Sequence, residues 1–193
     1  MSFEALFRSG HGPQDNFRAR LFGMFSEEIV RCWAANERAP YRDLGRPTLW
    51  APPEFATLDF TLQSRANSRC YVAEQKAELA FEGYRYLRLT AASQVQHHSG
   101  KRAFMWFLDT ALDPASHLVK VGARPTEVAG AILVWGAVTP EGRADAMQTY
   151  GFADVLAIED MLRDLRDWQD GAWRARVAEI RGWADGLFDG LTC

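Results

Sequence analysis

The strongest constraint on the fold is a nearly unbroken apolar run at residues 128–138, Val-Ala-Gly-Ala-Ile-Leu-Val-Trp-Gly-Ala-Val. Such a run is typical of a β-strand that is covered on both faces. A short polar segment with helical character follows at 141–149, and a second apolar run follows at 152–158. Strand, helix and strand in this order predict a parallel crossover unit, which is expected to be right-handed. The sequence therefore predicts an α/β fold.

Length and composition indicate a globular protein with one core. The chain has 193 residues, of which 48% are hydrophobic and 24% are charged, and this is enough for one domain. No apolar run approaches the length of a membrane span, and the first residues lack the basic and apolar regions of a signal peptide. The three cysteines are too few and too scattered for a disulfide framework. We therefore expect a single cytoplasmic domain over residues 1–193, with no membrane association.

Several other elements are predicted from periodicity and from breaker residues. Apolar positions on one face predict a helix at 17–34, and a second helical pattern covers 91–112 with an interruption near 99–100. The proline-rich segment 36–53 predicts an irregular connection with one short strand near 48–50.

The ends of the chain and one central stretch are less defined by pattern. The first twelve residues are expected to be loose, and no class is assigned to 77–89. The last 35 residues predict one or two amphipathic helices, with interruptions at Gly171 and Gly182.

Two runs that flank a polar centre at 65–68 predict a β-hairpin. The first arm covers 57–62 and the second covers 70–76. A loop centred between Ala66 and Asn67 places Asp59 directly opposite Glu74, and Thr57 opposite Lys76. Directly opposed residues share one face of the sheet.

The alternation of side chains then separates a polar face from an apolar face. Glu74 and Lys76 lie on the face that Asp59 also occupies, whereas Leu58, Phe60 and Leu62 are expected to point away and to anchor the hairpin in the core. Two like charges directly opposite each other destabilise a hairpin unless a positive charge lies between them. A divalent cation would remove this conflict.

The predicted ligand set suits Mg²⁺, with Mn²⁺ as a substitute. Mg²⁺ prefers oxygen ligands in an octahedral shell and is usually held by one or two carboxylates together with substrate phosphate. Asp59, Glu74 and the backbone carbonyl of Gln75 would supply these oxygens, and Glu28 on the first helix is a further candidate ligand. Lys76 would orient the nucleophilic water or neutralise charge that develops on a scissile phosphate.

On these residues the chain resembles the PD-(D/E)xK nucleases, the restriction-endonuclease-like superfamily. The motif is Asp59, then fourteen residues, then Glu74-Gln75-Lys76, within an element order that covers residues 15–160. The resemblance implies a three-layer core with a central mixed β-sheet flanked by helices, Mg²⁺ dependence, and hydrolysis of phosphodiester bonds in DNA or, less often, RNA. It also implies that Glu28 matches an acidic residue that many members carry on the first helix. Residues 160–193 are expected to form a helical extension outside this core.

The chain departs from the family pattern at two positions. The proline that precedes the family's aspartate is Leu58 here, and the middle residue of the last triplet, commonly apolar, is Gln75. An alternative interpretation of the motif is a solvated cross-strand ion pair on a protein surface, because short motifs of this kind also occur by chance. Glu28 has a similar alternative, since acidic side chains often lie at the edge of an apolar stripe with the carboxylate in water.

Candidate contacts to nucleic acid lie in the helical segment after the hairpin. The formal net charge is −3, so binding of a polyanion requires a local basic patch. His98, Lys101 and Arg102 are predicted to contact phosphate. The neighbouring His97 points about 100° away from His98 on a helix, so the two are poorly placed to bind one metal ion.

The functional expectation is a Mg²⁺-dependent nuclease that hydrolyses phosphodiester bonds, with DNA favoured over RNA. Asp59, Glu74 and Lys76 are its expected catalytic residues. The alternative is a catalytically inactive module on the same scaffold that binds nucleic acid or a protein partner. A delivering protein partner and a homodimer are both left open by the sequence.

Overall fold

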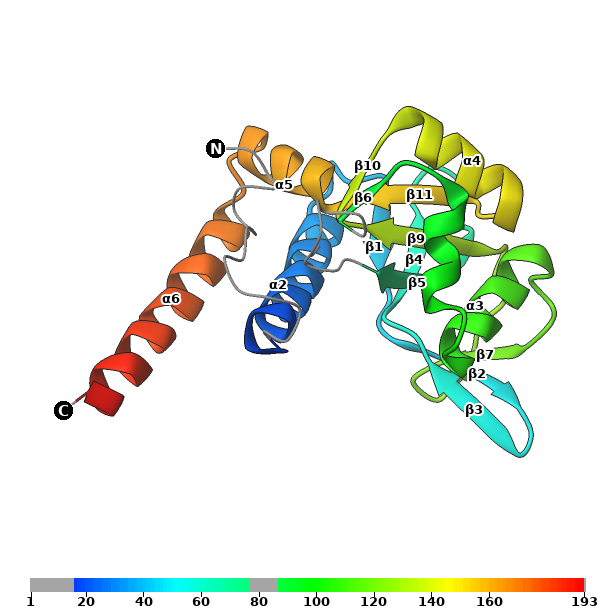
Figure 1. Ribbon diagram of the computed structural model, residues 1–193, viewed down its shortest axis with the longest axis horizontal. Coiled ribbons are helices and arrows are strands. Elements are labelled where there is room, and N and C mark those ends of the chain that lie inside the picture. The colour runs from blue at the N-terminus through cyan, green and yellow to red at the C-terminus, as the bar shows by residue number, and fades with distance from the viewer. Residues whose placement is uncertain (1–15, 77–86, 193) are drawn as a thin grey trace.

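A five-stranded mixed sheet forms the centre of the computed structural model, which describes residues 16–76 and 87–192 (Figure 1). The strand order is β1-β4-β5-β9-β11, in which β1, β4 and β5 are antiparallel and β5, β9 and β11 are parallel. Their bounds are Tyr41–Asp43, Phe60–Ser64, Cys70–Lys76, Ala131–Trp135 and Asp154–Ala157. The predicted parallel pairing of the two apolar runs is confirmed by β9 and β11. The chain is thus an α/β protein.

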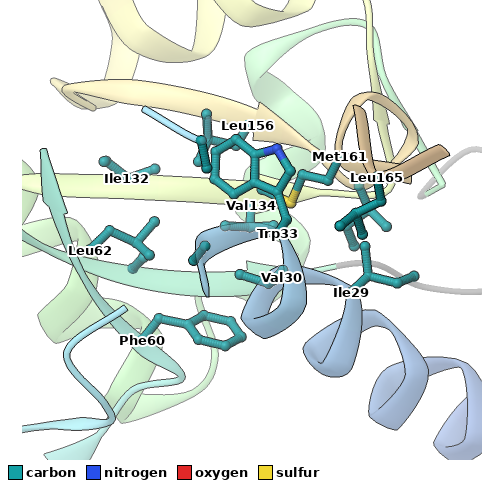
Figure 2. Close-up of a cluster of buried hydrophobic side chains, with 14 of the residues drawn as sticks. Ile29, Val30, Trp33, Phe60, Leu62, Ile132, Val134, Leu156, Met161 and Leu165 are labelled. Carbon is teal, nitrogen blue, oxygen red and sulfur yellow. The ribbon is translucent and has the colours of Figure 1, made fainter. Parts of the chain in front are cut away.

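Helices cover both faces of this sheet and create two apolar clusters. On one face lie α2, Asn16–Ala35, and α5, Ile158–Asp167, which bury Val30, Trp33 and Met161 against the sheet (Figure 2). On the other face, α3 (Arg102–Leu112), α4 (Pro140–Tyr150) and the 3-10 helix η1 (Ala92–His98) enclose the second cluster.

The strands contribute to both clusters by alternation. Phe60, Ile132 and Val134 point into the cluster under α2, whereas Val72 and Leu133 point into the cluster under α3. Strands that bury both faces require the continuous apolar runs from which they were predicted.

A second, four-stranded sheet extends from the region of α3. Its order is β3-β2-β7-β8, with all pairs antiparallel. The bounds are Glu54–Thr57, Pro47–Ala51, Leu118–Val121 and Arg124–Pro125. The β2–β3 hairpin projects from the body of the molecule at the end away from α6 (Figure 1). The short strand predicted near 48–50 is confirmed by β2, whereas the irregular connection expected over the rest of 36–53 is wrong in part, because it also contains β1.

The remaining elements are a short pair of strands and the terminal helix. A short parallel pair joins β6, Arg88–Leu89, to β10, Ala137–Val138. The predicted break between η1 and α3 is confirmed. The terminal helix α6, Gly171–Thr192, extends away from the sheet and runs through Gly182, so the expected interruption there is wrong. No helix within 16–76 or 87–192 is long and apolar enough to cross a membrane.

Candidate active site

The β4–β5 hairpin brings Asp59 and Glu74 together. Phe60 pairs with Ala73, and Gln63 pairs with Cys70, so the predicted register is confirmed and Asp59 is the next residue opposite Glu74. Asp59 lies just outside β4, at a bend in the chain.

The bend changes the partners of the residues that precede it. Thr57 pairs with Thr48 in the second sheet, so the predicted pairing of Thr57 with Lys76 is wrong. Leu58 is buried in the cluster under α3, separate from Phe60, because the bend interrupts the alternation of faces. The chain passes from one sheet to the other at this point, and Asp59 lies at the junction.

Two hydrogen-bond donors fix the Asp59 carboxylate. The backbone N–H of Gln75 donates to its Oδ2 at 2.9 Å, and the Arg46 guanidinium donates to its Oδ1 at 3.2 Å. The side chain of Gln75 lies on the other face of the strand and donates to the carbonyl of Gly23 on α2 at 3.5 Å. The middle position of the triplet therefore packs toward α2, and its backbone faces Asp59.

Lys76 and Glu74 form a close ion pair in a largely buried setting. The Lys76 Nζ donates to Glu74 Oε1 at 2.5 Å and to the Gln75 carbonyl at 3.3 Å. The two side chains are 16% and 8% exposed, respectively. The Lys76 ammonium also lies 5.5 Å from the ring centroid of Phe104. The lysine is thus held in place by an acid, a carbonyl and an aromatic face, which makes a solvated surface pair a poor description of the motif.

Burial raises the pKa of the Glu74 carboxyl to about 7, against the opposing effect of the Lys76 ammonium and with an added contribution from the negative charge of Asp59. Its Oε2 is buried and has no hydrogen-bond partner among the described residues. A buried carboxylate oxygen without a partner is costly, and a bound cation would satisfy it. The donor set of two carboxylates and one carbonyl fits a hard divalent ion.

Glu28 is not brought to this pair. Its Oε1 accepts from Arg31 at 3.2 Å, and its Oε2 accepts from Arg176 on α6 at 2.9 Å. Within the described part of the chain, no group of three or more His, Cys, Asp or Glu side chains is placed to hold a metal. The candidate ligands that the structure brings together are therefore Asp59, Glu74 and the carbonyl of Gln75.

The predicted phosphate contacts divide into one buried and two exposed residues. His98 is 4% exposed and packs between Phe104 and Trp135, with ring centroids 5.6 Å from each. It therefore supports the wall beside Lys76 and does not present its ring at the surface. Lys101 and Arg102 are exposed, and Arg102 forms an ion pair with Glu54 of β3 at 2.9 Å.

The buried histidine makes stability depend on pH. Burial lowers the pKa of His98 from 6.5 to about 4, and the charges of Lys76, His97 and Lys101 lower it further. As pH falls, His98 is protonated in the unfolded chain before it is protonated in the folded protein. The contribution of neutral His98 to stability is therefore complete above pH 6.5 and is lost as pH falls toward 4. Between pH 6.5 and 4, we expect the free energy of unfolding to fall by about 2–3 kcal/mol less in His98→Phe than in wild type.

Urea denaturation at pH 7, 5.5 and 4.5 measures this effect. The comparison is between wild type and His98→Phe at each pH, so that contributions from other groups, including Glu74, are present in both proteins. Parallel pH profiles for the two proteins would contradict the assignment.

Two contributors to the site were not found from the sequence. Arg46 binds Asp59, and Phe104 lies against Lys76. A signal for Arg46 existed in its position directly before the short strand predicted near 48–50.

Comparison with protein-family models, with curated proteins and with solved structures finds no match for this chain.

Proposed function

We propose that this chain is a Mg²⁺-dependent nuclease with a restriction-endonuclease-like core, and that it hydrolyses phosphodiester bonds in DNA. The observation that carries the proposal is the opposed pair Asp59 and Glu74, with Lys76 bound to the Glu74 carboxylate. The mixed sheet, in which an antiparallel hairpin leads into parallel strands with helices on both faces, is consistent with such a core.

Each residue of the site has a distinct role in this proposal. Asp59, Glu74 and the carbonyl of Gln75 would hold the ion, which supplies polarisation of the phosphate and a lower pKa for its water ligand. Glu74 can direct Oε2 to the ion while Oε1 keeps its hydrogen bond from Lys76. The ammonium of Lys76 is thereby positioned to neutralise charge on the phosphate as the bond breaks. The buried setting strengthens this interaction, because few waters screen it.

Two observations favour a second candidate function. Asp59 is already paired with Arg46, and no third acid joins the pair within the described residues. This is the arrangement expected of a module that binds nucleic acid or a protein partner after losing its metal. Metal affinity separates the two functions.

Titration calorimetry with Mn²⁺ tests the proposal directly. We expect the wild type to bind Mn²⁺ at pH 8, and we expect Glu74→Gln to weaken binding by about tenfold or more, because a charged ligand is lost. Since the proton and the metal compete for Glu74, the wild-type affinity should fall by up to about tenfold per pH unit below pH 7.

Glu28→Gln is the control for the loss of a carboxylate, because Glu28 is a partly buried acid, 24% exposed, that is bound by Arg31 and Arg176 away from the site. It should leave the Mn²⁺ affinity unchanged. If the Glu74 and Glu28 variants bind Mn²⁺ equally well, the carboxylate pair is not a metal site and the inactive module is favoured.

A further inference from the structure

The second sheet has one buried face and one open face. Leu49, Ala56 and Val119 are buried toward the cluster under α3. The alternate residues therefore point to the opposite side. Trp50 lies between Phe55 and Leu118, and the Phe55 side is open to solvent, since this residue is 54% exposed. Large apolar side chains gathered on an open face mark a binding surface more often than a scattered apolar residue does.

The open face combines aromatic rings with a cation. The rings of Trp50 and Phe55 lie 5.3 Å apart with an interplanar angle of 32°. The Lys120 Nζ lies 5.0 Å from the ring centroid of Trp50. In the register of the sheet, Lys120 and Thr57 are both partners of Thr48, one row nearer to the bend than the aromatic row. Rings for stacking beside a cation for phosphate are the features that bind single-stranded nucleic acid.

One end of this sheet adjoins the candidate active site. Arg46, directly before β2, forms an ion pair with Asp59 at 3.2 Å. From Phe55 the chain follows β3 to its end at Thr57, and Asp59 lies two residues later at the bend. Four residues of extended chain span at most about 13 Å. Phe55 therefore lies within about 13 Å of Asp59, and the sheet between them includes Lys120, opposite Thr48, with Arg46 bound to Asp59.

We propose that the open face of the β3-β2-β7 strands binds an unpaired DNA strand and leads it to Asp59 and Glu74. Bases stack on Phe55 and Trp50, and Lys120 and Arg46 contact the phosphates. The direction of the strand toward the acids rests on the proposed nuclease function, whereas the binding itself does not. An unpaired strand is specified because the bases of a duplex are already stacked on each other and offer no free faces to a sheet.

Fluorescence anisotropy with a labelled oligothymidine strand tests the binding in EDTA, so that no metal-dependent cleavage takes place. Phe55→Ala should weaken binding by about fivefold or more, which is the effect of one lost stacking partner. Lys120→Ala should weaken binding and reduce the slope of affinity against salt, because one phosphate contact is removed. Leu112→Ala is the control, since Leu112 is an apolar residue on α3 that is 71% exposed, and it should bind as wild type does.

Phe55 is exposed and Lys120 is half-buried, and thermal melting establishes that each variant is folded. Equal affinity of Phe55→Ala and Leu112→Ala would overturn the proposal, as would equal or tighter binding of a duplex of the same length, or binding confined to an RNA strand. A protein that binds the strand through Phe55 but cleaves no DNA with Mg²⁺ would retain the binding face and lose the nuclease function. If Phe55→Ala cleaves single-stranded DNA with an unchanged KM, the nuclease function is retained and the binding face is rejected.

Discussion

Lys76→Ala is expected to lower the rate of Mg²⁺-dependent DNA cleavage by about a thousandfold, the effect of removing one preorganised charge from a site of this kind. The ammonium is fixed by Glu74 and the Gln75 carbonyl and is only 16% exposed, so water cannot replace it in the same position. Lys76→Arg should restore little activity, because a guanidinium is larger and forked where a compact charge is held.

Asp59→Asn is expected to have an effect of similar size by a different route. The amide oxygen can still accept from the backbone N–H of Gln75, so the bend should keep its geometry. The charge that would bind the ion is lost. Cleavage of a plasmid and of single-stranded oligonucleotides with Mg²⁺ or Mn²⁺ measures both variants.

Arg166→Ala is the control for the loss of a cation, because Arg166 lies at the exposed surface of α5, on the far side of the sheet from Phe104 and Lys76. It should cleave at the wild-type rate. Circular dichroism and thermal melting establish that each variant is folded. The nuclease proposal fails if wild type, Lys76→Ala and Asp59→Asn all show the same activity.

The register of the site could be predicted because local chemistry determines it. The turn between β4 and β5 contains Asn67, whose Oδ1 accepts the N–H of Arg69 at 3.0 Å, and Ser68, which adopts a φ of 60°. Ser64 Oγ accepts the N–H of Ala66 at 3.3 Å. These are turn residues that hydrogen-bond their own backbone. Once the centre of the turn is known, counting the same number of residues along each arm places Asp59 opposite Glu74.

Only β2 of the second sheet could be predicted, as the short strand near 48–50, and the pairing of the sheet could not, because its strands are short and β2 and β7 are distant in sequence. β2 pairs with β7, from Pro47 opposite Val121 to Trp50 opposite Leu118. The prolines around β2 favour a loop when they are read locally, although Pro47 is the first residue of its strand, a position that proline tolerates. The partner that turns this segment into a strand lies about seventy residues later, where no local pattern indicates it.

Glu28 shows the same limit for a single side chain. Its place at the edge of the apolar stripe of α2 was evident from periodicity, and both a ligand and a surface carboxylate were open interpretations. What decides between them is Arg176, which donates to Glu28 from a helix 148 residues further along the chain. Helical period fixes the direction of a side chain but says nothing about a partner from another element.

Gly142→Ala is expected to lower the free energy of unfolding by about 3 kcal/mol. Gly142 lies in the first turn of α4, where its N–H donates to the Thr139 hydroxyl at 3.0 Å. An added Cβ would lie 2.8 Å from the Thr90 Cα and closer still to the carbonyl oxygen of Leu89. Both are backbone atoms, so the helix or the chain after β6 must shift. Urea denaturation at pH 7 measures the change.

Gly182→Ala is the matched control, because it makes the same substitution inside a helix without the backbone contact. Among the described residues, nothing lies within 4 Å of the position its Cβ would occupy in α6. Alanine favours a helix over glycine by about 1 kcal/mol, so this variant should be equal to wild type or slightly more stable. A loss of stability in Gly142→Ala without a loss in Gly182→Ala identifies close packing of α4 against the Leu89 backbone as the cause. A similar loss in both would attribute the effect to glycine itself and contradict that packing.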